Sequence, residues 1–277
     1  MKVKSIERRV GLAIAMAALL AGCATTSTGN RSEAEAASRS ERPTLRVGTS
    51  PTVPPIVFEE DGAIVGLEAD LAHELAAALE MEARLIPMYW PNLVFELRMG
   101  RIDIIMAGMS ITDERKRNVR FTDAYLTTGQ AALIRAEDIS AFRTVREVLA
   151  TRGTVGVEVD STGERYAAAN MPASNRRSFP TIQQAVEALV LGDVDVVIHD
   201  QPTVLWLARH QTEEALFVVP ERLTEEMLAW AVRRDNVELR DEVNAILAEW
   251  KESGRLDDIV AGWVSGPRVD PVEEAGQ

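Results

Sequence analysis

The chain has 277 residues, 46% of them hydrophobic, and a formal net charge of −13 at pH 7, so it is long enough to bury more than one core. An acidic chain without a basic cluster is a poor partner for nucleic acid or anionic lipid, and we expect neither. Its three histidines and single cysteine lack metal-ligand spacing, so we expect no metal and no cofactor.

The first 22 residues read as a targeting segment. Four basic residues among the first nine precede an apolar run over residues 10–20, which is too short to span a bilayer comfortably and is typical of a signal peptide. The run leads through Leu-Ala-Gly into Cys23, the only cysteine. This pattern predicts cleavage before Cys23 and acylation of its thiol, which would anchor the protein to a membrane surface. A chance cysteine is the alternative reading.

The segment that follows is expected to be a flexible tether over residues 23–43, because it carries no apolar side chain larger than alanine between Cys23 and Pro43. Residues 267–277 are expected to form a disordered tail. Loss of residues 1–22, which hold four basic residues and one acidic residue, would make the remaining chain three charges more negative.

From residue 44 onward, short β-rich runs alternate with helical patterns, which predicts an α/β fold with mainly parallel sheets. In the first half we expect strands over residues 45–49, 83–88 and 102–107 and helices over 67–81 and 93–99. In the second half we expect strands over 154–159 and 194–199 and helices over 164–170 and 182–191. Residues 97–105 and 189–197 both read as helix, glycine cap and buried strand, which indicates two similar lobes.

Ligands of open parallel sheets bind beyond the carboxyl ends of the strands, so the residues that follow each strand are candidate site residues. Gly108, Ser110 and Arg115 follow the strand over 102–107. They offer close backbone approach, a hydroxyl, and a planar guanidinium that fits a carboxylate. Asp200 follows the strand over 194–199. An arginine and an aspartate that face each other across a cleft would hold a zwitterion by both ends.

Five further residues lie at or beyond strand ends. Trp90 follows the strand over 83–88 and offers an apolar wall, and Ser50 follows the first strand. Glu158 is the penultimate residue of the strand over 154–159, and Ser161 and Thr162 lie in the polar turn that follows it. We include all five as candidate ligand-binding residues.

Several candidates have structural alternatives: Arg115 as part of an exposed basic run over 115–117, Asp200 as the cap of a helix that begins near Pro202, Trp90 as core, and Ser161 or Thr162 as a helix cap. His199 beside Asp200 invites interpretation as a catalytic pair. Adjacent strand residues point to opposite faces, which argues against that interpretation.

Four segments resemble the bacterial extracellular solute-binding proteins of the polar amino-acid type (family 3), the periplasmic binding proteins of ABC importers: residues 66–71, 108–115, 121–125 and 199–200. The similarity covers roughly residues 45–265. It implies a two-lobe Venus-flytrap fold with hinge strands near residues 125–130 and 224–228. Lobe 1 would contain residues 44–126 and 228–266, including C-terminal helices over 237–253 and 256–263, and lobe 2 would contain residues 127–227.

The resemblance also implies roles for site residues. In such proteins the residue at Arg115 binds the ligand α-carboxylate, helped by those at Ser110 and Gly108. The residue at Asp200 binds the α-ammonium, and an aromatic at Trp90 packs against the ligand. The sequence departs from the family pattern at four positions: Ser50 replaces an acidic residue, Val53 an aromatic one, Asp160 a glycine, and Glu158 a neutral or basic residue. These departures leave the ligand side chain undetermined.

Together with the predicted anchor at Cys23, the resemblance implies a monomeric, lipid-anchored protein of the periplasm or cell surface. It would bind an amino acid or related zwitterion and deliver it to an ABC transporter permease without catalysing a reaction. One alternative is a periplasmic cyclohexadienyl (prephenate or arogenate) dehydratase-like enzyme, in which Glu164 at a helix start serves as an acid. Another is a sensory lipoprotein that retains the cleft but acts on a signalling partner.

Overall fold

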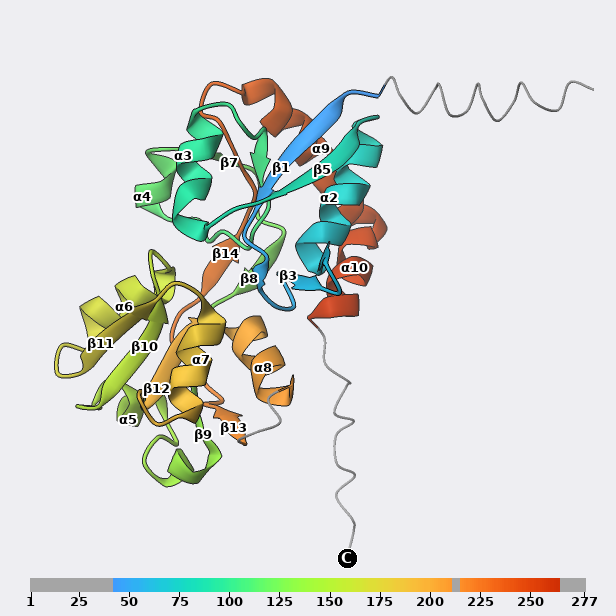
Figure 1. The fold of residues 1–277 in the computed structure, drawn as a ribbon. Coiled ribbons are helices and arrows are strands. Elements are labelled where there is room, and N and C mark those ends of the chain that lie inside the picture. Colours follow the sequence, from blue (N-terminus) through green and yellow to red (C-terminus); the bar gives the residue numbers. More distant parts are fainter. Residues whose placement is uncertain (1–41, 211–214, 265–277) are drawn as a thin grey trace, which may run out of the picture. The chain divides into compact units, whose positions relative to one another are not determined.

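The computed structural model describes residues 42–210 and 215–264 (Figure 1). The expected signal peptide, Cys23, the tether up to residue 41 and the tail over 267–277 lie outside the described residues. Within the described ranges, no helix is both long and apolar enough to cross a bilayer.

Lobe 1 is built on a five-stranded sheet with the order β5-β1-β6-β15-β7. Its strands are β1 (Thr44–Thr49), β5 (Glu82–Pro87), β6 (Ile104–Ile105), β7 (Arg120–Phe121) and β15 (Ala231–Val232). β1 pairs in parallel with β5 and β6, whereas β15 runs antiparallel to β6 and β7. The parallel pairs arise because helices connect these strands and return the chain to the same edge of the sheet.

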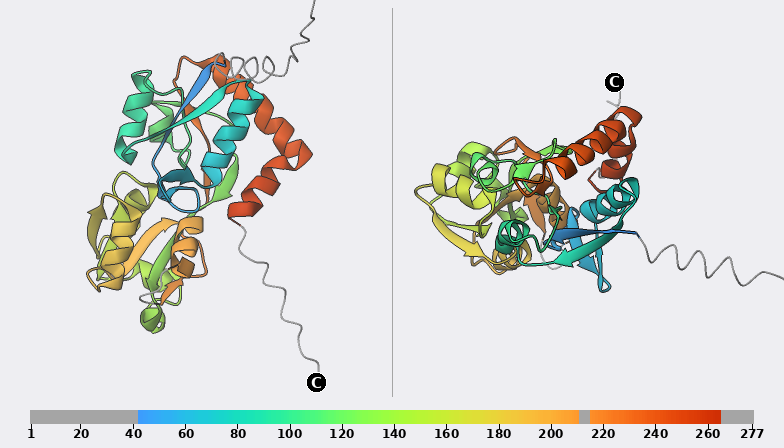
Figure 2. Two further views of the ribbon diagram at one scale, coloured as in Figure 1. Left: turned by 45° about the vertical axis from the view of Figure 1, so that its right-hand side comes forward. Right: turned by 90° about the horizontal axis from the view of Figure 1, so that it is seen from above.

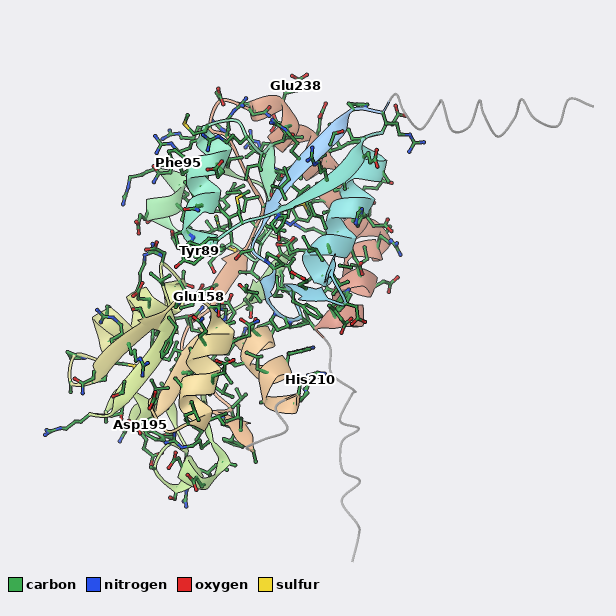
Figure 3. All side chains as sticks on the ribbon, viewed as in Figure 1. Tyr89, Phe95, Glu158, Asp195, His210 and Glu238 are labelled. Atoms are coloured by element: carbon green, nitrogen blue, oxygen red, sulfur yellow. The ribbon has the colours of Figure 1, made fainter. Side chains whose placement is uncertain are left out.

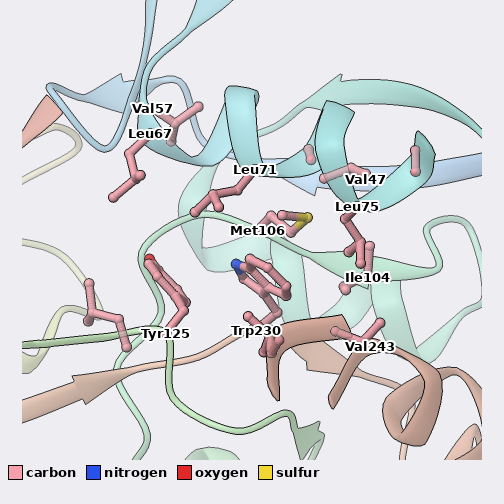
Figure 4. Packing of buried hydrophobic residues seen from close by; sticks show 14 of the residues in the cluster. Val47, Val57, Leu67, Leu71, Leu75, Ile104, Met106, Tyr125, Trp230 and Val243 are labelled. Carbon is pink, nitrogen blue, oxygen red and sulfur yellow. The ribbon is translucent and has the colours of Figure 1, made fainter. Parts of the chain in front are cut away.

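The helices of lobe 1 are α2 (Leu67–Ala78), η1 (Trp90–Asn92), α3 (Leu93–Arg98), α4 (Asp113–Lys116), α9 (Val237–Ser253) and α10 (Arg255–Trp263). Leu67, Leu71 and Leu75 line the buried face of α2 and pack in one cluster with Trp230 and Val243 (Figure 4). The two C-terminal helices thus return to lobe 1, as expected, and lie beside α2 (Figure 2).

A small three-stranded sheet of β2 (Thr52–Val53), β3 (Val57–Glu60) and β4 (Ala63–Val65) was not among the expected elements. The turn between β3 and β4 is Asp61-Gly62, and both residues have positive φ angles, 51° and 78°. An Asp-Gly pair between short apolar runs is a hairpin signal, so this element was readable from the sequence and was missed.

Lobe 2 is built on a second five-stranded sheet with the order β11-β10-β12-β9-β13. Its strands are β9 (Gln130–Arg135), β10 (Thr154–Glu158), β11 (Asn175–Phe179), β12 (Val196–Asp200) and β13 (Leu216–Val218). Its helices are η2 (Ala136–Ser140), α5 (Val145–Leu149), α6 (Thr162–Asn170), α7 (Ile182–Val190) and α8 (Gln201–His210). β10 runs parallel to β11 and β12, whereas β9 runs antiparallel to β12 and β13.

The two lobes repeat one local structure, as the sequence echo indicated. α3 and α7 each lead through a glycine with positive φ, Gly100 or Gly192, into a buried strand. In lobe 1 the Asp103 carboxylate accepts the backbone N–H of Arg46 at 2.9 Å. In lobe 2 the Asp195 carboxylate accepts the backbone N–H of Thr154 at 2.8 Å. Each aspartate therefore fixes its strand to the neighbouring strand.

Two hinge strands join the lobes, β8 (Leu126–Thr128) and β14 (Glu226–Leu228), which pair antiparallel outside both five-stranded sheets (Figure 1). The chain enters lobe 2 through β8 and returns through β14. Gly129 follows β8, and a side chain there would put its Cβ only 1.9 Å from the carbonyl oxygen of Thr224. Only glycine allows the two crossing segments to lie this close. The two-lobe α/β fold with two hinge strands is thereby confirmed.

Candidate functional site

A small cavity lies between the lobes, with a volume of about 30 Å³. Eight of the nine predicted ligand-binding residues line it: Trp90, Gly108, Ser110, Arg115, Glu158, Ser161, Thr162 and Asp200. Val53, Ala107, Gln130 and His199 complete the lining. The walls of the cavity come from both lobes, so we expect a solute to enter when the lobes separate and to be held when they close.

Arg115 is buried in the cavity wall, with 7% of its surface exposed, which rules out its interpretation as part of an exposed basic run. The short helix α4 places it there, and Thr112 caps this helix by accepting the backbone N–H of Arg115. Nη1 donates to the carbonyl oxygen of Ser110 at 3.0 Å, and the guanidinium lies 5.1 Å from the ring centre of Trp90. Burial lowers the pKa of Arg115 to about 10, so it stays charged at neutral pH.

Trp90 combines two of the interpretations left open by the sequence. It is partly buried against the apolar cluster around Leu93 and Leu97, and it also lines the cavity. Its Nε1 donates to the carbonyl oxygen of Asp160 in lobe 2 at 3.3 Å. Trp90 is therefore both a core residue and a contact between the lobes.

Asp200 ends β12 and is 9% exposed. Its carboxylate accepts a hydrogen bond from Nε2 of Gln130, and the same amide nitrogen donates to Oγ1 of Thr162 at 3.0 Å. In the described chain this carboxylate bonds to Gln130 and not to the first turn of α8, so the helix-cap interpretation is not supported. Burial raises the pKa of Asp200 to about 6, and the group is ionised at neutral pH.

Glu158 and His199 form a second buried pair, 3% and 5% exposed. Oε2 of Glu158 and Nε2 of His199 lie 2.9 Å apart on neighbouring parallel strands. Burial lowers the pKa of His199, but its hydrogen bond to Glu158 and nearby carboxylates more than offset this, so the net shift is upward. Figure 3 labels Glu158 at the edge of lobe 2 nearest lobe 1.

His199 and Asp200 make hydrogen bonds to different neighbours, as expected for adjacent strand residues. Both nevertheless line the cavity, because it lies beyond the end of β12, where the two faces of the sheet meet. They line one cavity but have separate hydrogen-bond partners, Glu158 and Gln130.

Gly108 lies in the cavity wall directly after the strand region of β6, with a positive φ of 68°. Its N–H donates to Oε1 of Glu68 at 2.8 Å. Glu68 is 1% exposed and also accepts from the Tyr125 hydroxyl at 2.8 Å and from Nε1 of Trp230 at 2.7 Å. Because its N–H is already bonded, Gly108 has only its carbonyl oxygen to offer a ligand.

Ser161 and Thr162 behave differently from each other. Ser161 caps α6, accepting the N–H of Glu164 at 3.0 Å and donating to the carbonyl of Glu158 at 2.7 Å. The capping alternative thus holds for Ser161. Thr162 instead accepts a hydrogen bond from Nε2 of Gln130 through its hydroxyl. Ser50 is buried but is not among the cavity-lining residues.

Four cavity residues were not among the candidates: Val53, Ala107, Gln130 and His199. Gln130 belonged to the expected hinge segment, and no local sequence signal distinguishes its side chain from those of its neighbours. Metal chemistry gains no support, since the described residues contain no cluster of three or more histidine, cysteine or carboxylate groups able to hold an ion.

Comparison with known proteins identifies relatives of this site and fold. The chain is 28% identical over 264 residues to the L-cystine-binding protein TcyJ of Escherichia coli K12, which covers 95% of this chain and 97% of that protein. It is 31% identical over 228 residues to the ABC transporter arginine-binding protein 1 of the same organism, covering 79% and 90%.

Among solved structures, an ancestral amino acid-binding protein described as a precursor of cyclohexadienyl dehydratase superposes with a TM-score of 0.74. The identity is 30%, and the match covers 84% of this chain and 99% of that one. A model of the bacterial extracellular solute-binding proteins, family 3, matches residues 45–266. Since this match spans nearly the whole described fold, the chain belongs to the bacterial extracellular solute-binding proteins of family 3.

Proposed function

We propose that the protein binds an amino acid between its lobes, with the α-carboxylate on Arg115 and the α-ammonium on Asp200. One observation carries the proposal: a buried cation of lobe 1 and a buried anion of lobe 2 line the same cavity. The two groups carry opposite charges at neutral pH, as the two ends of a zwitterion require.

The contacts of Arg115 suit this role. Its guanidinium donates to the backbone carbonyls of Ser110 and Asp160, which are neutral acceptors. A ligand carboxylate would replace at least one of them with a charge-assisted, bidentate hydrogen bond, which is the stronger kind. The Ser110 hydroxyl, also at the cavity, can donate to the same carboxylate, whereas the Gly108 carbonyl oxygen can only accept and would serve the α-ammonium.

Delivery to an ABC transporter permease is the second part of the proposal. Its support is the family membership and the similarity to an arginine-binding protein that is named for its ABC transporter. We further propose that the protein acts as a monomer at the periplasmic face or cell surface, held there by acylated Cys23. The sequence pattern around Cys23 supports the anchor.

Binding without catalysis fits the surroundings of Glu164, the residue on which a dehydratase-like activity would depend. Its Oε2 accepts the N–H of Asp160 at 2.8 Å, and its Oε1 accepts the hydroxyl of Ser178. Glu164 is not among the cavity-lining residues. Incubation of the purified protein with prephenate or arogenate tests this directly, and aromatic product that disappears in Glu164→Gln would establish the enzyme instead.

Isothermal titration against the twenty amino acids tests the binding site. Truncating one partner of a buried charge pair costs about 2–5 kcal/mol, so Arg115→Ala should weaken binding by roughly 30-fold or more. Arg117→Ala is the matched control, because Arg117 is an exposed neighbour in the same basic run. Unchanged affinity in Arg115→Ala would reject the assigned site.

A further inference from the structure

We propose that the lobe 2 wall of the cavity is a subsite for a second positive group, with Glu158 as its acceptor, so that the bound amino acid has a cationic side chain. The inference rests on the proposed function, because it assumes that Arg115 and Asp200 hold the two ends of the ligand backbone. It names the ligand class that the same cavity takes: a diamino or guanidino acid.

The first argument is the balance of charge among the cavity-lining residues. They comprise one arginine, two carboxylates and one histidine: Arg115, Asp200, Glu158 and His199. A zwitterion pairs its carboxylate with Arg115 and its ammonium with Asp200. Glu158 then has no charged group of the ligand backbone to pair with, and its neighbour His199 is a cation only when protonated. A buried carboxylate without a permanent countercharge favours a ligand that supplies one.

The second argument is the unused hydrogen-bonding capacity of Glu158. Its Oε2 faces Nε2 of His199 at 2.9 Å, but its Oε1 is fully buried and has no hydrogen-bond partner within the described part of the chain. An unpaired buried acceptor is costly, and a carboxylate oxygen more so. An ammonium or guanidinium on the ligand would satisfy it with a charge-assisted bond.

Gln130 adds a second acceptor to the same wall. Its Nε2 donates to both Asp200 and Thr162, and since a carboxylate can only accept, the amide nitrogen must face Asp200. This orientation leaves Oε1 of Gln130 buried and likewise unpaired among the described residues. This oxygen lies beside Gly163 of α6, so Glu158 is the acceptor on which the subsite depends, and Gln130 adds a second unpaired acceptor near it.

The remaining walls suit the apolar stem of such a side chain. Val53 of β2, which is 6% exposed, and the indole of Trp90 line the cavity from lobe 1. Lysine, ornithine and arginine combine a methylene stem with a charged end, so the stem can lie along apolar surface while the end reaches a carboxylate.

Protonation of His199 opposes this ligand class, because an imidazolium would neutralise Glu158. Three carboxylates raise the pKa of His199: Glu158, Asp200 and Glu226. The cation that lines the same cavity is Arg115 of lobe 1. A cationic ligand group beside Glu158 should expel the imidazole proton. Binding of a cationic ligand is therefore coupled to proton release, and its affinity rises with pH.

The test compares cationic amino acids with neutral ligands of the same shape: L-lysine with L-norleucine, and L-arginine with L-citrulline. Isothermal titration of the wild-type protein should show each cationic ligand binding at least about tenfold more tightly than its neutral counterpart, which corresponds to one charge-assisted hydrogen bond. Titration of arginine in buffers of different ionisation enthalpy should show proton release, and titration of citrulline should show less.

Glu158→Gln should reduce the preference for arginine over citrulline to near one. Equal or tighter binding of the neutral ligands by the wild-type protein overturns the inference, and this comparison does not depend on the variant folding. A preference for the cationic ligand that survives Glu158→Gln also overturns the inference. Failure of every amino acid to bind would overturn the proposed function itself, whereas Arg115-dependent binding without any preference for the cationic ligand would overturn only the cationic subsite.

Discussion

Nη2 of Arg115 in lobe 1 donates a hydrogen bond to the backbone carbonyl of Asp160 in lobe 2, over 3.3 Å. The same carbonyl accepts from Trp90 at 3.3 Å and from Arg165 at 3.2 Å. Asp160 has a positive φ of 58°, and this turn brings its carbonyl within reach of lobe 1. The contacts that close the lobes around Arg115 thus converge on one residue in a left-handed conformation.

Asp160→Val should therefore disturb both stability and ligand binding. A left-handed conformation costs a residue with a Cβ about 1–2 kcal/mol, and a β-branched one tolerates it least. We expect a lower melting temperature and weaker ligand binding, measured by calorimetry and titration. Asp160→Gly is the matched control and should preserve both, because glycine adopts this φ freely. Unimpaired binding by the valine variant would contradict the role assigned to this turn.

The unliganded protein should be more stable near pH 5 than near pH 8, because burial raises the pKa of Glu68 from 4.5 to about 7. A raised carboxyl pKa means that this contribution to stability is complete below the unfolded pKa and is lost as pH rises through the folded one. For Glu68 the difference amounts to about 3 kcal/mol. Chemical denaturation across this range measures it.

Two other buried groups, Asp200 and His199, also make the folded protein less stable as pH rises, since their pKa values are raised as well. Glu68→Gln isolates the contribution of Glu68: the pH dependence of the unfolding free energy should become shallower but should not vanish. A variant with the wild-type slope would show that Glu68 is not the main titrating group.

Ligand affinity should fall as pH drops through about 6, because burial places the pKa of Asp200 there and only the carboxylate pairs with an ammonium. L-Citrulline is the appropriate probe, since its neutral side chain adds no positive charge beside Glu158 and His199. Asp200→Asn should bind at least about tenfold more weakly at pH 7.5. Its affinity should also be nearly independent of pH between 5 and 8, and a retained wild-type pH profile would contradict the assignment.

Phe58 of lobe 1 and Trp206 of lobe 2 form an aromatic contact between the lobes, with ring centres 5.5 Å apart. Neither side chain lines the ligand cavity. Such pairs contribute about 0.5–1.5 kcal/mol beyond area burial, and this one exists only when the lobes are closed. Trp206→Leu should therefore weaken ligand binding by roughly 2- to 10-fold.

His210→Ala is the control for this contact, because His210 stacks on Trp206 within lobe 2, with ring centres 3.8 Å apart. It should change the stability of lobe 2 without changing ligand affinity. Equal affinity losses in the two variants would show that the effect arises inside lobe 2 and not from closure.

Cys23→Ser should release the protein from the membrane. If Cys23 carries the acyl anchor, the wild-type protein partitions with the membrane fraction and the serine variant does not, since no thiol remains to be acylated. Fractionation of expressing cells, followed by immunoblotting, measures the distribution. A serine variant that still sediments with membranes would reject the anchor.

Many helices and strands followed from local patterns. α7 begins and ends within one residue of the expected 182–191, because its apolar face has helical spacing and Gly192 supplies the stop. β11 was missed because it is an edge strand with four of its five residues exposed, so it shows no apolar alternation. Its pairing with β10 defines it as a strand, and pairing is not a local property.

The site residues likewise separate into those with a local sequence signal and those without one. Residue types at strand ends were enough to nominate Arg115, Asp200 and Glu158, because parallel sheets place their binding residues there. Glu68 gave no such signal. Its role depends on Gly108, Tyr125 and Trp230, which lie 40, 57 and 162 residues away in the sequence.

Family, two-lobe plan and the identity of the two charged residues are all encoded in short stretches of sequence, because periodicity, glycine caps and strand-end motifs act over a few residues. The raised pKa of Asp200, the unpaired oxygen of Glu158 and the hydrogen bonds that converge on the Asp160 carbonyl are not encoded in that way. They arise from burial and from hydrogen-bond partners that separate segments of the chain bring together, so they exist only once the chain is folded.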